Sequence, residues 1–174
     1  VTLVYRKGYG RQHLDKDGVQ TETYRDLDPA NHMQDTGMEI SLPLDGVELW
    51  AKVWRADITG VSGHVVPVYF LDTFHPKNSE KHLELGLTLY GGDDWVRIRQ
   101  EYLLGVGGLR LLDKLGLEVD GLHLNEGHCT FALLEMLGKG WSREQLAKRV
   151  LFTTHTPVPA GHDRFEWEAV EEVL

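Results

Sequence analysis

Two short stretches carry the side chains best suited to chemistry. The first, residues 122–128, reads Leu-His-Leu-Asn-Glu-Gly-His, and the second, residues 152–157, reads Phe-Thr-Thr-His-Thr-Pro. Each is a short β-type run followed by polar groups and then by a helical pattern. In an open α/β sheet, ligands bind in the crevice beyond the carboxyl ends of the parallel strands. We therefore expect one common volume to be faced by Asn125, Glu126, His128, Thr154 and His155.

Side chains of these types are suited to binding a sugar. Asn, Asp, Glu and His supply the hydrogen-bond donors and acceptors that carbohydrate hydroxyls require. Aromatic residues make up 9% of the chain, including five tryptophans, and flat rings suit the apolar faces of sugars, although such rings also fill cores. The residue types alone therefore favour a sugar site without identifying a reaction.

Metal binding and nucleophilic catalysis are weaker interpretations of the same residues. A metal site needs three or four converging ligands, and the histidines near the two stretches lack the one-turn spacing of His-Glu-x-x-His. His123 is expected within a strand. Cys129, the single cysteine, follows His128 on an apolar helix face, where a buried structural thiol is the better interpretation. We expect neither a metal site nor a covalent nucleophile.

Composition narrows the class of protein. With 174 residues, 41% of them hydrophobic and 26% charged, the chain is long enough for one domain with a substantial core. A net charge of −9 without Lys or Arg clusters argues against nucleic acid or an anionic membrane as partner. No run approaches the length of a membrane-spanning helix. One cysteine cannot form an intrachain disulfide, which fits a cytoplasmic protein.

Residues 1–75 predict mainly β-structure. The expected elements are strands at 1–5, 40–44, 47–55 and 65–71, a hairpin at 12–24 and a loop at 26–38. Asp15–Gly18 supplies the turn of the hairpin, and Pro43 favours an edge or irregular strand. The continuous apolar run 65–71 is consistent with a buried strand. Antiparallel strands so close together suggest an excursion from the main sheet.

Residues 76–174 predict an α/β unit. Its strongest helix spans 94–115, with Asp94 as N-cap, Gly116 as the C′ residue and Gly105 explained by close packing; a helix broken near Gly105 is the alternative. The further expected elements are strands at 119–124 and 149–153, helices at 129–137 and after Ser142, and a final helix capped by Asp163. This alternation is the signature of a parallel α/β unit.

Four motifs together resemble the α-glucan phosphorylases. They are LYGGD at 89–93, RIRQEYLLG at 97–105, HLNEGH at 123–128 and FTTHTPVPAGHD at 152–163. Their order and spacing are similar to those of the bacterial and archaeal branch of the glycogen/maltodextrin phosphorylase family. Residues 5–9 and 18–20 resemble the segment that precedes them in that family. The resemblance covers nearly the whole chain.

The resemblance implies a fold class and a reaction. The fold is α/β, a Rossmann-like parallel sheet with a β excursion, as part of the N-terminal domain of a two-domain glycosyltransferase. The reaction is phosphorolysis of terminal α-1,4-linked glucosyl units of glycogen or maltodextrin to glucose 1-phosphate, with retention. The family uses pyridoxal phosphate, whose phosphate group exchanges protons with the substrate phosphate. The sugar passes through an oxocarbenium-like state.

The resemblance also assigns roles by position. His155 matches the family's active-site histidine, whose side chain is expected to bond the glucosyl 6-hydroxyl while its main-chain carbonyl faces the developing positive charge. Asp93 falls with Gly91 and Gly92 in the segment that gates substrate access. The positions that line the glucose pocket beside C1 are Asn125, Glu126, His128 and Thr156.

The resemblance also indicates what the chain lacks. The family's cofactor lysine, its phosphate-binding cluster and its acidic residue on the sugar 3-hydroxyl belong to a C-terminal domain outside this chain. Both ends look cut, so we expect a fragment that is inactive alone. Expected partners are α-1,4-glucan, phosphate or glucose 1-phosphate, and the missing domain; a homo-oligomer is left open. The alternatives are a glycogen-synthase-like glycosyltransferase using a sugar nucleotide, and a non-catalytic glucan-binding remnant.

Overall fold

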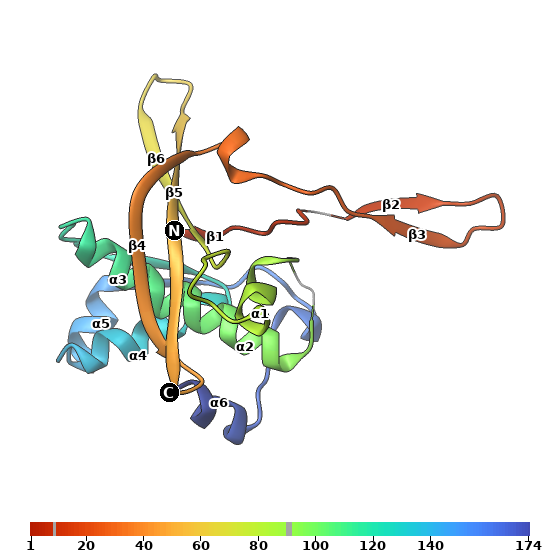
Figure 1. Cartoon of the computed structure of the whole chain (residues 1–174). Helices are drawn as coiled ribbons and strands as arrows, with labels where there is room; N and C mark the ends of the chain where they lie inside the picture. Colours follow the sequence, from red (N-terminus) through yellow and green to blue (C-terminus); the bar gives the residue numbers. More distant parts are fainter. Residues whose placement is uncertain (9, 90–91) are drawn as a thin grey trace.

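The computed structural model describes residues 1–8, 10–89 and 92–174, which form an α/β body with two projecting hairpins (Figure 1). No described helix is long and apolar enough to cross a membrane. The elements are β1 (Thr2–Leu3), β2 (Arg11–Leu14), β3 (Gln20–Thr23), η1 (Pro29–Asn31), β4 (Gln34–Leu44), β5 (Val47–Thr59), β6 (Val65–Asp72), α1 (Glu80–Leu83), η2 (Glu84–Gly86), α2 (Asp94–Tyr102), η3 (Leu103–Gly107), α3 (Gly108–Lys114), β7 (Leu122–Asn125), η4 (Gly127–Cys129), α4 (Phe131–Gly138), α5 (Arg143–Arg149), β8 (Val150–Thr153), η5 (Pro159–Gly161) and α6 (Trp167–Val173).

A mixed four-stranded sheet in the order β1-β6-β5-β4 dominates the first half of the chain. β1 is parallel to β6, whereas the β6–β5 and β5–β4 pairs are antiparallel. Leu49, Ala51 and Val53 of β5 are fully buried and alternate with more exposed residues, which confirms the predicted half-buried strand. Pro43 lies on the edge strand β4, as predicted, where a missing N–H is tolerated.

Some sequence expectations for this half are wrong. β4 begins at Gln34, inside the expected loop 26–38. The sequence did not predict this part of the strand, because an irregularity between Asp35 and Glu39 interrupts its alternation. The apolar run 65–71 is buried only at its end, since its first residues lie on the projecting β5–β6 hairpin. The expected strand 1–5 pairs only over Thr2–Leu3. The antiparallel strands form the larger sheet, so the fold is α/β with a mixed sheet.

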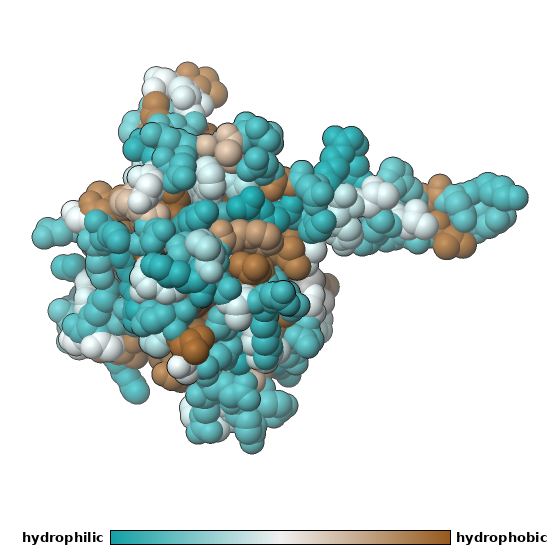
Figure 2. Space-filling model, viewed as in Figure 1, coloured by the Kyte–Doolittle hydropathy of each residue, from teal (hydrophilic) through white to brown (hydrophobic). Residues whose placement is uncertain are grey.

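The predicted hairpin at 12–24 is confirmed and extends away from the body (Figure 1). All eight residues of β2 and β3 are exposed, and Figure 2 shows this arm as mostly hydrophilic. Asp15 Oδ1 accepts hydrogen bonds from the N–H groups of Asp17 and Val19, and Gly18 has a φ of 79°. Asp15 and Gly18 thus stabilise the turn as predicted, through side-chain hydrogen bonds to the backbone and a positive φ.

The helix predicted at 94–115 is continuous but contains one π-helical turn. Asp93, rather than Asp94, is the N-cap, because its Oδ1 accepts a hydrogen bond from the N–H of Val96 at 3.1 Å. Gly116 has a φ of 65°, as a C′ residue requires. At Gly105 the helix widens into η3 instead of breaking, and a Cβ there would lie 2.6 Å from the Ala132 nitrogen. The predicted close packing is confirmed.

Two hydrophobic clusters form the core. The larger joins the inner face of β4, β5 and β6 to the α2–α3 helix through residues such as Leu42, Val53, Ile98 and Leu103. The smaller joins α3, β7, α4 and α5; its buried members are Leu109, Leu124, Ala132, Met136 and Leu146. The second cluster holds the β7–β8 pair against the helices. Both clusters share the α2–α3 helix, which therefore connects the mixed sheet to the parallel pair.

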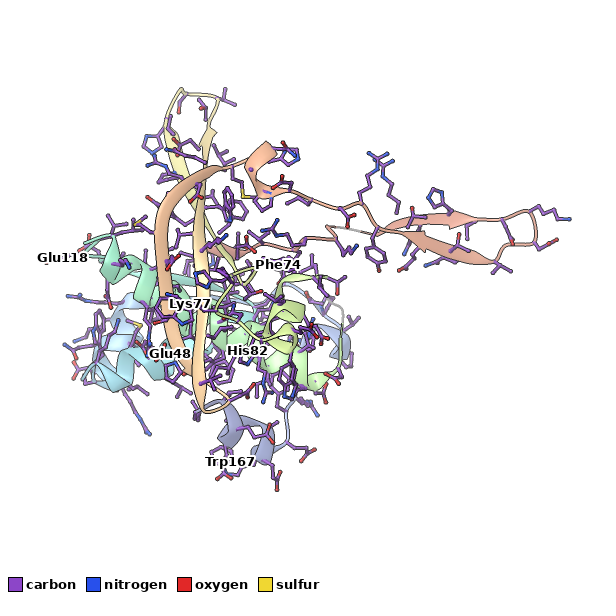
Figure 3. The ribbon with its side chains drawn as sticks, in the orientation of Figure 1. Glu48, Phe74, Lys77, His82, Glu118 and Trp167 are labelled. Atoms are coloured by element: carbon purple, nitrogen blue, oxygen red, sulfur yellow. The ribbon has the colours of Figure 1, made fainter. Side chains whose placement is uncertain are left out.

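The segment after β6 packs back on the sheet. Figure 3 shows Phe74, Lys77 and His82 on this segment, beside β4 and β5. The Lys77 ammonium lies 3.5 Å from the ring centre of Trp50. The Asn78 side chain accepts from the Trp50 N–H at 2.9 Å and donates to the Trp50 carbonyl at 2.7 Å. These contacts fix the connection between the sheet and the α2–α3 helix.

An ion cluster around the buried Arg99 fastens the β4–β5 turn to the helices. The side chain of Arg99 is 2% exposed. Its Nε donates to Asp45 at 2.9 Å, and its second amino group donates to Asp45 at 2.5 Å and to Glu172 at 3.0 Å. The imidazole of His82 lies 3.2 Å from Asp45. Asp45 therefore balances the charge that α2 buries, as a buried guanidinium requires.

We expect Asp45→Asn to lower stability at pH 7 and to weaken its dependence on acid. Burial alone would raise the pKa of Asp45, but hydrogen bonds and charges of Arg99 and His82 hold that pKa below its ordinary value. The carboxylate therefore stabilises the fold above its unfolded pKa, about 4, and this stabilisation is lost as pH falls through the folded pKa. Urea unfolding at pH 7 and pH 3 measures the difference. Asp17→Asn, on the exposed arm, is the control, and equal pH dependence of the wild type and Asp45→Asn would contradict the assignment.

Candidate functional site

The two stretches with chemically useful side chains lie side by side. β7 and β8 pair in parallel, with Leu122 opposite Val150 and Asn125 opposite Thr153. The expected final helix starts at Trp167 rather than at Asp163, so residues after β8 form a loop with one 3₁₀ turn, η5. The carboxyl ends of both strands therefore lead into polar loops at one edge, which is where ligands bind in such sheets.

Glu126 connects the two loops. Its Oε1 accepts hydrogen bonds from the main-chain N–H groups of His155 at 2.7 Å and Thr156 at 2.9 Å. Its own N–H donates to the carbonyl of Thr153 at 2.8 Å. Glu126 is 2% exposed and has a φ of 61°, which is uncommon for a residue other than glycine. Backbone strain of this kind is maintained where the surroundings determine the conformation, as at functional sites.

Hydrogen bonding lowers the pKa of Glu126. The main-chain N–H of His155, followed by groups of Thr156 and Thr154, lowers the pKa of Glu126 to about 2 against the opposing effect of burial. The group is therefore a carboxylate at neutral pH and is unsuited to act as a general acid. Its other oxygen, Oε2, is buried and has no hydrogen-bond partner among the described residues. One acceptor of this carboxylate is thus left unsatisfied.

The other predicted site residues surround Glu126 at different depths. The side chain of His155 is 61% exposed, and its Nδ1 lies 3.3 Å from Glu126 Oε1. Asn125 and Thr154 are exposed, Thr156 is half-buried, and the imidazole of His128 is 30% exposed. The structure therefore brings together the residues of both loops. It leaves their side chains accessible, while Glu126 holds the backbone beneath them.

Asp93 lies at the start of α2. Its carboxylate caps α2, one helical turn before Arg97. Gly92 has a φ of 89°, a conformation in which a side chain would be strained. Gly91, which the resemblance places in the gating segment, lies outside the described residues together with Tyr90. A role for Asp93 in substrate access stays a prediction.

A polar cluster beside the loops was missed by reasoning from the sequence. Glu101 of α2, His128 of η4 and Asp163 bring ligating atoms within 4.8 Å of one another. Arg97 forms an ion pair with Asp163, which was expected to cap a helix. The signal for this cluster was the polar pair Arg97 and Glu101, which lie one turn apart on the same helix. Its partner Asp163 could not be identified without the fold.

The cluster is suited to holding a proton. Burial raises the pKa of Glu101 to about 8, with a further increase from the hydrogen bond and charge of Asp163. Burial would raise the pKa of Asp163 as well, but Glu101 and Arg97 keep it below its ordinary value. At neutral pH Glu101 is therefore protonated and shares its proton with the Asp163 carboxylate. A cation at this point would be repelled by Arg97, whereas a shared proton satisfies both carboxyl groups.

The chain is similar to phosphorylases over its whole length. It is 34% identical over 191 residues to the maltodextrin phosphorylase of Thermococcus litoralis, covering 100% of this chain and 22% of that protein. It is 37% identical over 198 residues to the glycogen phosphorylase of Mycobacterium tuberculosis, with 100% and 22% covered. With the glycogen phosphorylase of Aquifex aeolicus it shares 32% over 193 residues, with 99% and 26% covered. No protein-family model matches the chain.

The similarity to these relatives extends over the motifs that the structure brings together. The alignments include β7, β8 and the two polar loops, because they extend over 99–100% of this chain. The chain spans only 22–26% of the length of these relatives. With this similarity along its entire length, the chain belongs to the glycogen and maltodextrin phosphorylase family.

Proposed function

We propose that the complete protein is an α-glucan phosphorylase, which cleaves terminal α-1,4-linked glucosyl units of glycogen or maltodextrin with phosphate and releases glucose 1-phosphate. The observation that carries this proposal is the identity of 32–37% along the whole chain to enzymes with these names. These residues would form part of an N-terminal, Rossmann-like domain, with a mainly β part at 1–75 and an α/β part at 76–174. The parallel β1–β6 and β7–β8 pairs support that assignment.

We assign one wall of the glucosyl pocket to the loops after β7 and β8. The exposed imidazole of His155 would bond the sugar 6-hydroxyl, and Asn125, His128 and Thr156 would bond other hydroxyls. The two N–H groups held by Glu126 fix the backbone of the second loop. The main-chain carbonyl of His155 is then a preorganised dipole, suited to stabilise positive charge at C1 without reorganisation.

Phosphorolysis breaks the bond between C1 and the glycosidic oxygen and forms a bond between C1 and a phosphate oxygen. The proton released by phosphate is transferred to the departing glycosidic oxygen, which becomes the 4-hydroxyl of the shortened glucan. Pyridoxal phosphate, when bound, would supply a phosphate group that relays this proton. In the family that the chain resembles, the lysine that holds this cofactor belongs to the C-terminal domain, so this lysine would come from outside these 174 residues. The residues here would bind and orient the glucosyl unit.

We expect His155→Ala in the complete enzyme to lower kcat by up to about tenfold, the equivalent of one lost hydrogen bond to a neutral hydroxyl. The melting temperature should change little, because the side chain is 61% exposed. Glucose 1-phosphate release from maltodextrin measures the effect. His13→Ala, on the exposed β2–β3 arm, is the control. A kcat equal to that of the wild type would contradict the role given to His155.

The complete protein should contain pyridoxal phosphate and should release glucose 1-phosphate from maltodextrin only when phosphate is present. Elongation of glucan from a sugar nucleotide, without the cofactor, would instead identify a glycogen-synthase-like glycosyltransferase. Glucan binding without either reaction would identify a binding remnant. The proposal includes the missing C-terminal domain as partner and a cytoplasmic location, which the single cysteine favours.

A further inference from the structure

Two strands each have one edge without a strand partner among the described residues. β1 ends the four-stranded sheet, and β7 pairs with β8 on one side only. In a parallel pair, alternate residues direct their main-chain groups to the partner. The N–H of Val4 donates to Leu71, so the main-chain groups of Leu3 point away from β6. By the same rule, since Glu126 bonds Thr153, the main-chain groups of His123 and Asn125 point away from β8.

A groove of about 620 Å³ lies between these two edges. It is lined by every residue from 1 to 5 and every residue from 122 to 125. Successive residues of a strand face opposite sides of a sheet, so a cavity lined by all of them adjoins the edge of the strand. The groove is therefore a gap within the plane of a sheet. Its lining from the helix is largely apolar, including Leu104, Leu109 and Leu112.

Contacts of the helix that lines the groove indicate the relative direction of the two edges. At its far end, Gly108 lies beside Val1, where the β1 segment starts. Gln100 donates to a carbonyl of η2, and η2 in turn bonds the chain just after β1. The next residue, Glu101, lies beside His128, just after β7. Adjacent helix residues thus lie at the carboxyl ends of both strands, and from this we infer that β1 and β7 run in the same direction.

We propose that this groove receives one extended β-strand of the same polypeptide, from the part of the protein outside these 174 residues, and that this strand pairs in parallel with both β1 and β7. The sheet order would become β8, β7, inserted strand, β1, β6, β5, β4. The relatives supply the occupant, because 74–78% of their length lies outside the match. Edges inside a folded protein are paired or covered, and two edges that face each other across one groove accept a single strand.

The inserted strand also completes the candidate site. A strand parallel to β1 and β7 ends at the same edge as they do, so the loop that follows it reaches Asn125, His128 and Glu101. Glu101 Oε1 is buried and has no hydrogen-bond partner among the described residues. We expect a donor from this loop to bind that oxygen, since buried acceptors are normally satisfied.

Hydrogen exchange in the complete protein tests the proposal. The amides of Leu3, His123 and Asn125 should exchange at least about a hundredfold more slowly than those of the exposed β2–β3 arm, whose strand hydrogen bonds open locally. The protection should be the same at all protein concentrations and without glucan. Rapid exchange would overturn the proposal. So would protection that appears only at high concentration, which indicates a second copy, or only with maltodextrin, which indicates a sugar.

A variant in the helix gives an independent test. A Cβ at Gly108 would meet no described atom closer than 3.8 Å, and Gly108 lines the groove of about 620 Å³, so in an open groove the side chain of Gly108→Leu has room. With a strand in the groove, the added side chain overlaps it, and the melting temperature of the complete protein should fall by several degrees. Gly138→Leu, at a helical position with no atom within 4 Å, is the matched control. Equal melting temperatures for both variants would overturn the proposal.

Discussion

Gly105→Ala should destabilise the protein by about 1–3 kcal/mol, the usual cost of overpacking a well-packed core. The added Cβ would lie 2.6 Å from the Ala132 nitrogen and 2.9 Å from the carbonyl carbon of Phe131. These are backbone atoms of α4, which cannot rotate away as a side chain can. The helix α4 would have to move, and the loop after β7 would move with it. Thermal unfolding and phosphorolysis by the complete enzyme should both show the loss.

Gly138 provides the control for this substitution. It is also helical, at the end of α4, but a Cβ there meets no atom within 4 Å. Gly138→Ala should therefore be neutral or stabilise the protein by about 0.5–1 kcal/mol, because alanine loses less backbone entropy on folding. If both variants were as stable as the wild type, the close contact between the α2–α3 helix and α4 would not exist in solution.

Glu126→Ala should lower kcat of the complete enzyme about a hundredfold, the effect of displacing a bound group by about 1 Å. The change leaves the N–H groups of His155 and Thr156 without their acceptor, so the loop that carries the imidazole loses its position. Glu126→Gln keeps one acceptor oxygen but not the charge that strengthens these bonds, and its kcat should lie between those of the wild type and Glu126→Ala. Phosphate-dependent release of glucose 1-phosphate measures the series.

Glu118→Ala is the matched control, because Glu118 is exposed on the connection before β7 (Figure 3). A kcat for Glu126→Ala within about twofold of the control would show that the loop keeps its position without the carboxylate. A kcat for Glu126→Gln below that of Glu126→Ala would also contradict the assignment, because the remaining acceptor oxygen should preserve part of the activity.

Elements defined by local chemistry could be predicted from the sequence. The β2–β3 turn, the capping box of Ser142 and Gln145, and the C′ glycine Gly116 each depend on neighbouring residues only. The grouping of Asn125 with His155 was predictable too, because both follow strands of one parallel pair. Such features need no knowledge of the rest of the fold.

Other features depend on contacts between distant parts of the chain. The run at 65–71 has the composition of a buried strand, yet Val65 and Val66 are exposed because the hairpin extends beyond the body. The proton shared by Glu101 and Asp163 depends on a loop that follows β8, and its energetics depend on burial. The role of Glu126 as a connection between loops requires a positive φ, which no sequence pattern indicated.

The π-helical turn η3 sets the rotational phase between the two ends of the long helix. An α-helix turns by about 100° per residue, and a π turn accommodates one extra residue without breaking the helix. On one side of it, Glu101 faces Asp163; on the other, Leu109 faces the core beside Leu124. Deleting one residue from 103–107 would leave the residues of both contact surfaces in place in the sequence. It would, however, rotate one end of the helix by about 100° relative to the other, so that both surfaces could no longer face their partners together. The extra residue of this turn therefore orients the polar cluster at Glu101 relative to the apolar contact at Leu109.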